Sequence, residues 1–209
     1  MRCVIIAGSP DAEINFIAEQ VKDCNYLICA DKGYEYAKKA GIKPDLIVGD
    51  FDSYSGELPD DCEIIKLNSH KDDTDLLHCI GVALSRGYDD FLILAATGGR
   101  FDHTFANIST LMYLDKKGAK GEIVSSREII RFLKKGEYKI NDCKGKTFSV
   151  FPFACESVNV TYIGAEHSAD NLVLTAEDAM GVSNIFTTDK AAVKINYGNA
   201  IFILNSVVN

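Results

Sequence analysis

The chain has 209 residues, with 22 Lys and Arg against 30 Asp and Glu, which gives a formal net charge of −8. This length allows one large domain or two small ones, and a core of that size needs no disulfide support. The acidic balance argues against a general nucleic-acid surface, because such a surface needs a basic stripe. A few local Lys and Arg residues can still hold the phosphates of a nucleotide.

The seven cysteines lie mostly in apolar runs, without a CxxC pair or a His partner at zinc-finger spacing. This usage is typical of a reduced cytosolic protein, in which cysteine packs as a small hydrophobe. Residues 1–10 hold one basic residue and too short an apolar run for a signal peptide. No window reaches the length of a membrane span, so we expect a cytoplasmic protein without membrane association.

The first 125 residues alternate short β-branched runs with amphipathic stretches, a pattern typical of a mostly parallel sheet flanked by helices. We predict strands at residues 2–7, 26–30, 46–48, 63–67, 91–95 and 122–125. We predict helices at residues 11–23, 34–40, 74–86 and 103–117. Gly41, Gly87 and Gly118 follow three of these helices and can supply left-handed caps. The expected fold of residues 1–125 is a three-layer α/β domain.

After about residue 126, helical periodicity gives way to short alternating runs separated by turn residues. We predict strands at residues 128–133, 137–140, 147–153, 157–163, 171–174, 192–197 and 200–204. This spacing is typical of an all-β sandwich or barrel. We therefore expect a boundary between residues 1–125 and 126–209, with a β-sandwich as the second domain.

Two carboxylates follow the predicted strand at residues 46–48, in the sequence Gly-Asp-Phe-Asp-Ser at residues 49–53. Ligands of α/β proteins bind beyond the carboxyl ends of the sheet strands. A hard divalent cation carrying nucleotide phosphates requires such acids at that place. Turn formation alone explains Asp50 and Asp52 equally well, because Gly, Asp and Ser all favour turns.

A second acidic cluster, Asp-Asp-Thr-Asp at residues 72–75, opens the predicted helix that follows the fourth strand. Acids are favoured there by the helix dipole, and helix capping explains Asp72 or Asp73. Capping explains Asp75 less well, because three acids within four residues repel one another unless a cation neutralises them.

The second predicted strand leads into Ala-Asp-Lys-Gly at residues 30–33. Asp31 either belongs to a ligand site or caps the helix that follows. Lys32 either binds phosphate as a point charge or is a solvated surface lysine.

The fifth predicted strand leads into Thr-Gly-Gly-Arg-Phe-Asp-His at residues 97–103. The glycines allow the backbone to approach a ligand, and its amides could cradle phosphate oxygens beside the bidentate charge of Arg100. A Gly-Gly turn alone is weak evidence, but Arg100, Asp102 and His103 behind it at a strand end favour a site. For His103, a helix-start residue bonded to a neighbouring carboxylate is favoured over a catalytic base.

Taken together, these motifs resemble those of the thiamine pyrophosphokinase (thiamine diphosphokinase) family. The match rests on residues 30–33, 41–53, 71–75 and 97–103, with Asn107 downstream, and on Gly-Val-Ser-Asn at residues 181–184. Their order and spacing cover nearly the whole chain, and the combination is more specific than any single motif.

The resemblance implies an N-terminal α/β domain that binds ATP and a C-terminal β-sandwich that helps to bind thiamine. It implies transfer of the β,γ-diphosphoryl unit of ATP to the hydroxyethyl oxygen of thiamine, with release of AMP. It also implies a homodimer whose active sites form between the α/β domain of one subunit and the β-domain of the other.

Carried over by position, Asp50, Asp52 and Asp75 would hold Mg²⁺, and these three with Arg100 and Asp102 would form the catalytic set. Arg100 and Asp102 would border the phosphates and the reacting hydroxyl. Either Asp102 or Asp75 would orient or deprotonate that hydroxyl. Phosphoryl-type transfer is catalysed chiefly by positioning and by charge neutralisation, which this set can supply.

The resemblance also implies two sets of binding residues. The nucleotide would be contacted by Asp31, Lys32, Thr74, Thr97, Gly98, Gly99 and Arg100. Thiamine would be contacted by Asp75 and Asp102, and by Ser183 and Asn184 from the partner subunit.

Two departures from the family pattern concern these contacts. Members often have a second glycine where Lys32 stands, and some place a tryptophan against thiamine, whereas this chain has no Trp. Phe186 or Tyr197 could stack on the thiamine ring instead, although ordinary strand positions also explain both.

The same acids could direct water instead of an alcohol, so the alternative function is a metal-dependent phosphohydrolase acting on a nucleotide or a thiamine phosphate. A non-catalytic nucleotide-binding or sensor module is a third reading. The full acid set and Arg100 disfavour it.

Overall fold

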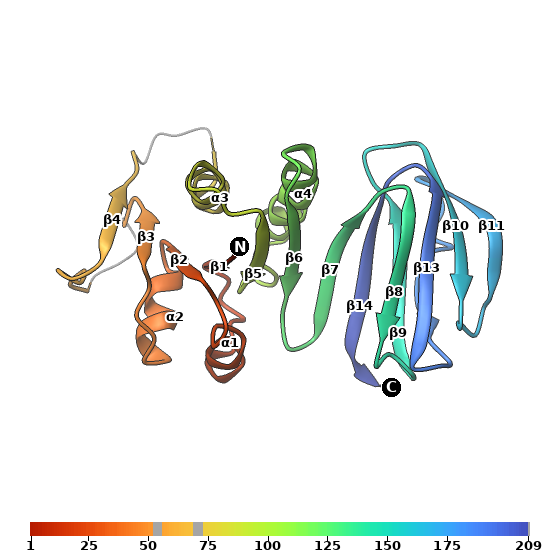
Figure 1. Ribbon diagram of the computed structural model, residues 1–209, viewed down its shortest axis with the longest axis horizontal. Helices are drawn as coiled ribbons and strands as arrows, with labels where there is room; N and C mark the ends of the chain where they lie inside the picture. Colours follow the sequence, from red (N-terminus) through yellow and green to blue (C-terminus); the bar gives the residue numbers. More distant parts are fainter. Residues whose placement is uncertain (52–55, 69–72, 209) are drawn as a thin grey trace. The chain divides into compact units, whose positions relative to one another are not determined.

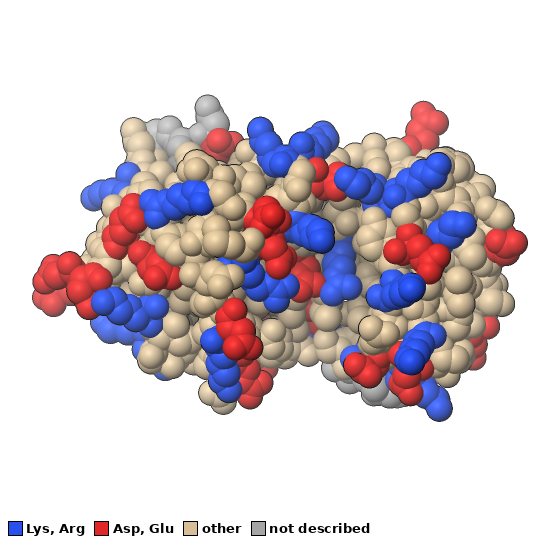
Figure 2. Space-filling view, in the orientation of Figure 1, with Lys and Arg blue, Asp and Glu red and all other residues tan. Residues whose placement is uncertain are grey.

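The computed structural model of the chain describes residues 1–51, 56–68 and 73–208. The chain forms two compact units, the N-terminal unit Met1–Ser126 and the C-terminal unit Arg127–Asn209. Within the described ranges, none of the helices has both the length and the apolar character needed to cross a membrane. Acidic and basic side chains are interspersed over the face in view in Figure 2.

A parallel sheet forms the centre of the N-terminal unit (Figure 1). Its strands are β1 (Arg2–Ile6), β2 (Tyr26–Ala30), β3 (Leu46–Gly49), β4 (Glu63–Lys66), β5 (Asp90–Leu94) and β6 (Lys120–Val124). Their order across the sheet is β6-β5-β1-β2-β3-β4, and each adjacent pair is parallel. The central strands are almost fully buried, which explains their continuous apolar sequences.

Helices lie on both faces of this sheet (Figure 1). They are α1 (Ile14–Gln20), α2 (Gly33–Lys39), α3 (Asp75–Ser85) and α4 (Phe101–Lys116). Figure 1 shows α1 and α2 on one face and α3 and α4 on the other. The chain therefore leaves β1 toward one face and β5 toward the opposite face, although these two strands are neighbours.

The predicted left-handed caps are confirmed, because Gly41, Gly87 and Gly118 have φ values of 69°, 84° and 77°. The first helix begins later than predicted, at Ile14 instead of residue 11. The Asp11 carboxylate accepts a hydrogen bond from a distant backbone amide, and this tertiary contact takes the place of a helical start.

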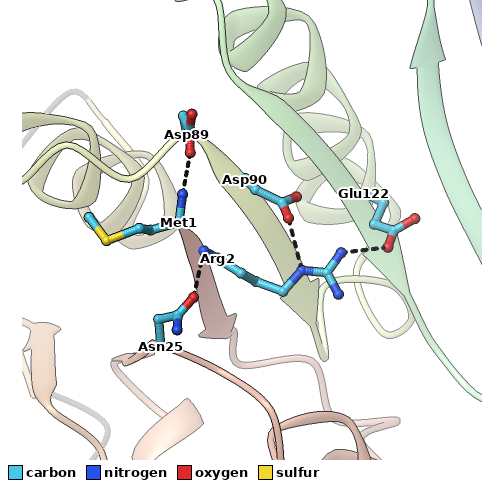
Figure 3. Close-up of polar contacts among 6 residues, drawn as sticks. All are labelled: Met1, Arg2, Asn25, Asp89, Asp90 and Glu122. Carbon is cyan, nitrogen blue, oxygen red and sulfur yellow. Dashed lines mark hydrogen bonds and ion pairs between the residues drawn. The ribbon is translucent and has the colours of Figure 1, made fainter.

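A polar network joins three strands at their amino ends (Figure 3). Arg2 Nε lies 3.1 Å from the Asp90 carboxylate, and its Nη2 lies 3.5 Å from Glu122. The terminal amine of Met1 lies 2.6 Å from Asp89. Figure 3 shows the Arg2 side chain reaching from β1 across β5 toward β6, so these ion pairs reinforce the parallel register at the edge of the sheet opposite the strand carboxyl ends.

The C-terminal unit is built from antiparallel strands (Figure 1). They are β7 (Glu128–Leu133), β8 (Gly136–Asn141), β9 (Lys146–Pro152), β10 (Ser157–Ile163), β11 (Ala169–Thr175), β12 (Asn184–Ile185), β13 (Lys190–Tyr197) and β14 (Ala200–Val208). One group has the order β12-β9-β14-β7 and the other β11-β10-β13-β8.

One hydrophobic core combines side chains from both groups of strands. At its centre Phe148 of β9 stacks on Phe186 with ring centroids 4.1 Å apart. The ring of Tyr162 from β10 meets Phe148 edge-on at 5.2 Å. The alternating pattern read from the sequence thus places one face of each strand in this core. The two-residue strand β12 was not predicted, because it is too short to show alternation.

Candidate active site

A cleft of about 640 Å³ lies at the carboxyl ends of the strands in the N-terminal unit. It is lined by the segments that follow β1, β2 and β5 and by the start of α3. The chain leaves the neighbouring strands β1 and β5 toward opposite faces, so this pair is the switch point of the sheet, and the loops after both strands line the cleft. Ligands of open α/β sheets bind at such a switch point.

Backbone hydrogen bonds extend the pairing of β1 and β5 into the cleft. The amide of Ala7 donates to the carbonyl of Leu94, and that of Ser9 donates to Ala95, each at 2.9 Å. The loop after β1 is thereby fixed as one wall of the cleft. Our sequence reasoning missed this loop, because Ala-Gly-Ser-Pro at residues 7–10 carries no charge. Its small residues after the first strand were the available signal.

The two glycines of the β5 loop fit closely against the loop after β1. A Cβ atom on Gly98 would lie 2.2 Å from the Asp11 carboxylate, and one on Gly99 would lie 2.6 Å from Pro10. Both glycines also have positive φ, at 100° and 64°. Their amides have partners within the protein, Thr104 Oγ1 for Gly98 and Asp11 Oδ2 for Gly99. The glycines therefore shape the loop, and neither amide is left over for a phosphate cradle.

Arg100 lines the cleft, whereas Asp102 is not among the described residues that line it. The two side chains form a bidentate pair, with Arg100 Nε 3.1 Å from Asp102 Oδ1 and Nη2 2.5 Å from Oδ2. Hydrogen bonding from Arg100 lowers the pKa of Asp102 below its usual value. Asp102 thus orients the guanidinium and is a poor proton acceptor while the pair is intact.

Two further polar residues of α4 lie in the cleft. The side-chain amide of Asn107 donates to the carbonyl of Ala96 at 2.8 Å and so fixes the β5 loop to the helix. His103 is exposed, and its backbone amide donates to Asp102 Oδ1 at 2.9 Å.

Asp31 and Lys32 both line the cleft after β2. Asp31 has a left-handed backbone with φ 42°, and a Cβ on Gly49 would lie 3.0 Å from its Cα. The residue at the N-cap of α2 is Lys32, whose side chain makes no capping bond. The carbonyl of Asp31 accepts a hydrogen bond from the amide of Tyr34 at 3.1 Å, so the ligand-site and the helix-cap interpretations of Asp31 both stay predictions. Its strained position beside the cleft fits a site residue.

The start of α3 brings Asp73, Thr74 and Asp75 to the cleft. Thr74 is the N-cap, and its hydroxyl accepts a hydrogen bond from the amide of Leu77 at 3.3 Å. The capping explanation for Asp73 is therefore wrong, while Asp72 lies outside the described residues. Asp75 is partly buried in the first turn, where the helix dipole favours its negative charge.

Replacing Thr74 with alanine is expected to destabilise the protein by about 1 kcal/mol, because the first turn of α3 loses its cap. Urea unfolding followed by circular dichroism measures this change. Thr74→Ser retains a hydroxyl at the same place and should keep the wild-type midpoint. Equal midpoints for the alanine and serine variants would show that the cap does not stabilise α3.

Three predicted site residues of this unit remain. Asp50 follows β3 and is partly buried, and Thr97 follows β5. Neither is among the described residues that line the cleft. Asp52 lies outside the described residues. Within residues 1–51, 56–68 and 73–208, no three Asp, Glu, His or Cys side chains are grouped closely enough to hold a metal ion.

In the C-terminal unit, Ser183 and Asn184 lie at the start of β12 and differ in exposure. Ser183 is exposed and has a left-handed backbone with φ 60°. Asn184 is buried, and its side chain bonds to both backbone groups of His167, accepting at 3.1 Å and donating at 2.8 Å. Asn184 thus fixes the segment that contains His167, and it also borders a cavity of this unit.

The two aromatic residues suggested to stack on the thiamine ring differ in exposure. Phe186 is fully buried against Phe148, so the suggestion that it stacks on a ligand is wrong. Tyr197 is 48% exposed on β13, with its hydroxyl 3.0 Å from that of Ser157.

The fold and the cleft define an α/β protein with a ligand site at the switch point of a parallel sheet, followed by a β-unit. A model of the catalytic domain of thiamin pyrophosphokinase matches residues 17–123. A model of the vitamin B1 binding domain of thiamin pyrophosphokinase matches residues 133–202. The chain belongs to the thiamine pyrophosphokinase family.

Individual relatives agree with this assignment. Thiamine pyrophosphokinase of Bacillus subtilis is 29% identical over 186 residues, covering 86% of this chain and 87% of the relative. Thiamin pyrophosphokinase 1 of Caenorhabditis elegans is 22% identical over 205 residues, covering 92% and 84%.

Solved structures show the same fold. A crystal structure of thiamine pyrophosphokinase from Bacillus subtilis matches with a TM-score of 0.87 at 26% identity, covering 99% of this chain and 100% of that chain. Yeast thiamin pyrophosphokinase matches with a TM-score of 0.80 at 18% identity, covering 99% and 86%. The predicted combination of an α/β part and an antiparallel β part is confirmed.

Proposed function

We propose that the chain catalyses the ATP-dependent pyrophosphorylation of thiamine, transferring the diphosphoryl group of ATP to the hydroxyl of thiamine and releasing AMP. The observation that carries this conclusion is the match of both thiamin pyrophosphokinase domain models, in order, to the two parts of the chain. The phosphohydrolase alternative has no support among these relatives.

ATP binds in the cleft of the N-terminal unit, residues 1–125 in our sequence-based boundary. Asp31, Lys32 and Thr74 line this cleft together with Gly98, Gly99 and Arg100, and Thr97 belongs to the same loop. The planar guanidinium of Arg100, held by Asp102, is suited to bidentate contact with phosphate oxygens.

A divalent cation, Mg²⁺ in our proposal, is held by Asp50, Asp52 and Asp75. The carboxylates at the cleft fit a hard cation in kind, because Mg²⁺ prefers oxygen ligands. When bound, the ion would neutralise charge on the triphosphate and act as a Lewis acid. Asp75 is the member of this set that lines the cleft within the described part of the chain.

Arg100 and Asp75 have separate roles in the reaction. Arg100 positions the transferring phosphates and neutralises their charge. Asp75 orients the thiamine hydroxyl and accepts its proton, because Asp102 is engaged by Arg100 and has a lowered pKa.

Thiamine is bound with help from the C-terminal unit, residues 126–209 in our boundary, through Ser183 and Asn184. We further propose a cytoplasmic homodimer, in which the α/β domain of one subunit and the β-domain of the other share an active site. We also propose that the α/β domain has three layers and that the β-domain is a sandwich.

Incubation of the protein with ATP, Mg²⁺ and thiamine, followed by chromatography, tests the reaction. AMP and thiamine diphosphate should appear in equal amounts, and neither should form when thiamine is left out. Release of ADP or phosphate without an acceptor would indicate a hydrolase instead. ATP binding without turnover would indicate a non-catalytic module.

A further inference from the structure

The loop after β5 is fixed at three consecutive carbonyl groups by donors from other elements. The carbonyl of Ala95 accepts a hydrogen bond from the amide of Ser9 at 2.9 Å. The carbonyl of Ala96 accepts from the side-chain amide of Asn107 at 2.8 Å. The carbonyl of Thr97 accepts from the hydroxyl of Ser9 at 2.5 Å. Ser9 therefore supplies two of these three bonds, and both come from the loop after β1.

The first residue of this loop has a strained backbone. Ala95 is left-handed, with φ 53°, a conformation that alanine rarely adopts. Such a conformation persists only where the surrounding contacts fix it. The two bonds from Ser9 end on Ala95 itself and on Thr97, two residues later. They are therefore among the contacts that hold the strained turn, and the loop is expected to move when one of them is lost.

Every polar group of Ser9 has a partner in the protein. Besides the two bonds to the β5 loop, its carbonyl accepts from the hydroxyl of Tyr36 at 2.8 Å, and its hydroxyl accepts from the amide of Asp11 at 3.3 Å. Tyr36 is 6% exposed, and burial raises its pKa above the usual value, so its hydroxyl keeps its proton and donates. Ser9 lines the cleft, but its own hydroxyl proton is given to Thr97. Its role at the cleft is therefore to hold protein groups in place.

The group that this loop presents to the cleft is the guanidinium of Arg100. Two glycines separate Arg100 from Thr97, so the anchored carbonyl lies close to it along the chain. Arg100 pairs with Asp102, which belongs to the same segment. This pair orients the guanidinium relative to its own segment but does not fix that segment to the sheet. Contacts with the loop after β1, such as the hydroxyl bond of Ser9, supply that second constraint.

We propose that Ser9 is a positioning residue for the transfer reaction, whose hydroxyl holds the β5 loop and so sets the place of the Arg100 guanidinium beside the transferring phosphates. The proposal rests on the proposed function and adds a residue outside the motifs found in the sequence. Phosphoryl-type transfer depends chiefly on positioning and on charge neutralisation. A small displacement of Arg100 should therefore slow the reaction.

The test is Ser9→Ala in the full chain, which removes the hydroxyl and leaves the backbone bonds of residue 9 in place. At saturating ATP, Mg²⁺ and thiamine, kcat should fall about 10- to 100-fold, the loss that a misplaced group causes. The KM for thiamine should stay unchanged. Ser9→Thr retains a hydroxyl at the same place and should keep the kcat of the wild type.

The loss should also depend on Arg100. In an Arg100→Gln background, Ser9→Ala should cause no further fall in kcat, because the group that Ser9 positions is already gone. A merely structural role of Ser9 would lower kcat by the same factor in both backgrounds. The double-mutant cycle therefore separates positioning of Arg100 from a general loss of stability.

Ser85→Ala is the matched control in the same unit. The hydroxyl of Ser85 donates to the carbonyl of Val82 at 2.7 Å, at the end of α3 opposite to the end that lines the cleft. Each alanine variant loses one bond from a hydroxyl to a carbonyl and should melt no more than about 4 °C below the wild type. Ser85→Ala should keep the kcat of the wild type.

Tyr36→Phe is the second variant, for the case that Ser9→Ala does not fold. It removes the hydrogen bond to the carbonyl of Ser9 and leaves the ring in place. kcat should fall in the same direction, again only while Arg100 is present.

Three results would overturn the proposal. A normal kcat in Ser9→Ala, or in Tyr36→Phe where the first variant does not fold, would show that this link does not position Arg100, and the proposed function would stand without it. Equal losses with and without Arg100 would show that Ser9 acts at another place. If the wild type does not convert thiamine, the proposed function is wrong, and so is the role of Ser9 in it.

Discussion

Replacing Asp75 with asparagine is expected to lower kcat by about 100- to 10,000-fold, the range over which a positioned acid or base contributes to catalysis. Asp75 is the first residue of α3, is partly buried and lines the cleft. The substitution keeps the size of the side chain but removes its charge. Asparagine can therefore neither accept the proton of the thiamine hydroxyl nor supply negative charge to a bound cation.

The protein should remain folded in this variant. The charge of Asp75 at the helix start contributes about 0.3–1 kcal/mol through the helix dipole, and Thr74 retains the cap. Urea unfolding beside steady-state turnover at saturating ATP, Mg²⁺ and thiamine separates the two effects.

Asp73→Asn is the matched control, since it removes the same charge two residues earlier at an exposed position on the cleft. We expect only a few-fold change in kcat. Asp102→Asn should change turnover indirectly, by altering the position of Arg100, because the two side chains form a bidentate pair. Near-normal turnover in Asp75→Asn would remove this residue from the chemical step.

Replacing Gly33 with alanine is expected to destabilise the protein by about 2–3 kcal/mol, as overpacking of a core does. Gly33 is buried at the start of α2, and a Cβ there would lie 2.0 Å from the carbonyl oxygen of Ile6. Backbone atoms of β1 and α2 would have to separate. The clash lies next to Asp31 and Lys32, so the KM for ATP should rise as well.

Gly81→Ala is the matched control for this substitution. Gly81 lies inside α3, and a Cβ there would meet no atom within 4 Å. Alanine should stabilise the protein by about 0.5–1 kcal/mol, because it has the better helix propensity. Urea midpoints measure both variants. A Gly33→Ala midpoint at or above that of the wild type would contradict the close contact of α2 with β1.

The order and type of the elements other than β12 could be predicted, because each of them has a clear local signal. β2 and β10 have the predicted boundaries, 26–30 and 157–163, since apolar or alternating runs there end at turn residues. Tertiary contacts override local signals elsewhere. The predicted start of the first helix, residue 11, was wrong, because the carboxylate of Asp11 accepts a hydrogen bond from the backbone amide of Gly99.

From the sequence, the candidate site could be predicted only as a set of residues that follow the strands. Sequence alone does not show that β1 lies between β5 and β2, and this order decides which loops share a cleft. It therefore brings Asp31, Asp75 and Arg100 to one cavity, whereas Asp50 is not among the described residues that line it. The shift in the pairing of β10 with β11 between Val160 and Tyr162 leaves no signature in the alternation of the chain.

The interlocking of the loops after β1 and β5 has a consequence for biogenesis. The Gly99 amide and the Asp11 carboxylate are separated by 88 positions along the polypeptide, and contacts of such long range form late compared with local ones. A nascent chain that has not yet emerged past this glycine lacks one wall of the cleft. A ligand of the cleft, ATP in our proposal, can therefore stabilise only a nearly complete N-terminal unit, and it cannot act as a template for the earliest folding events.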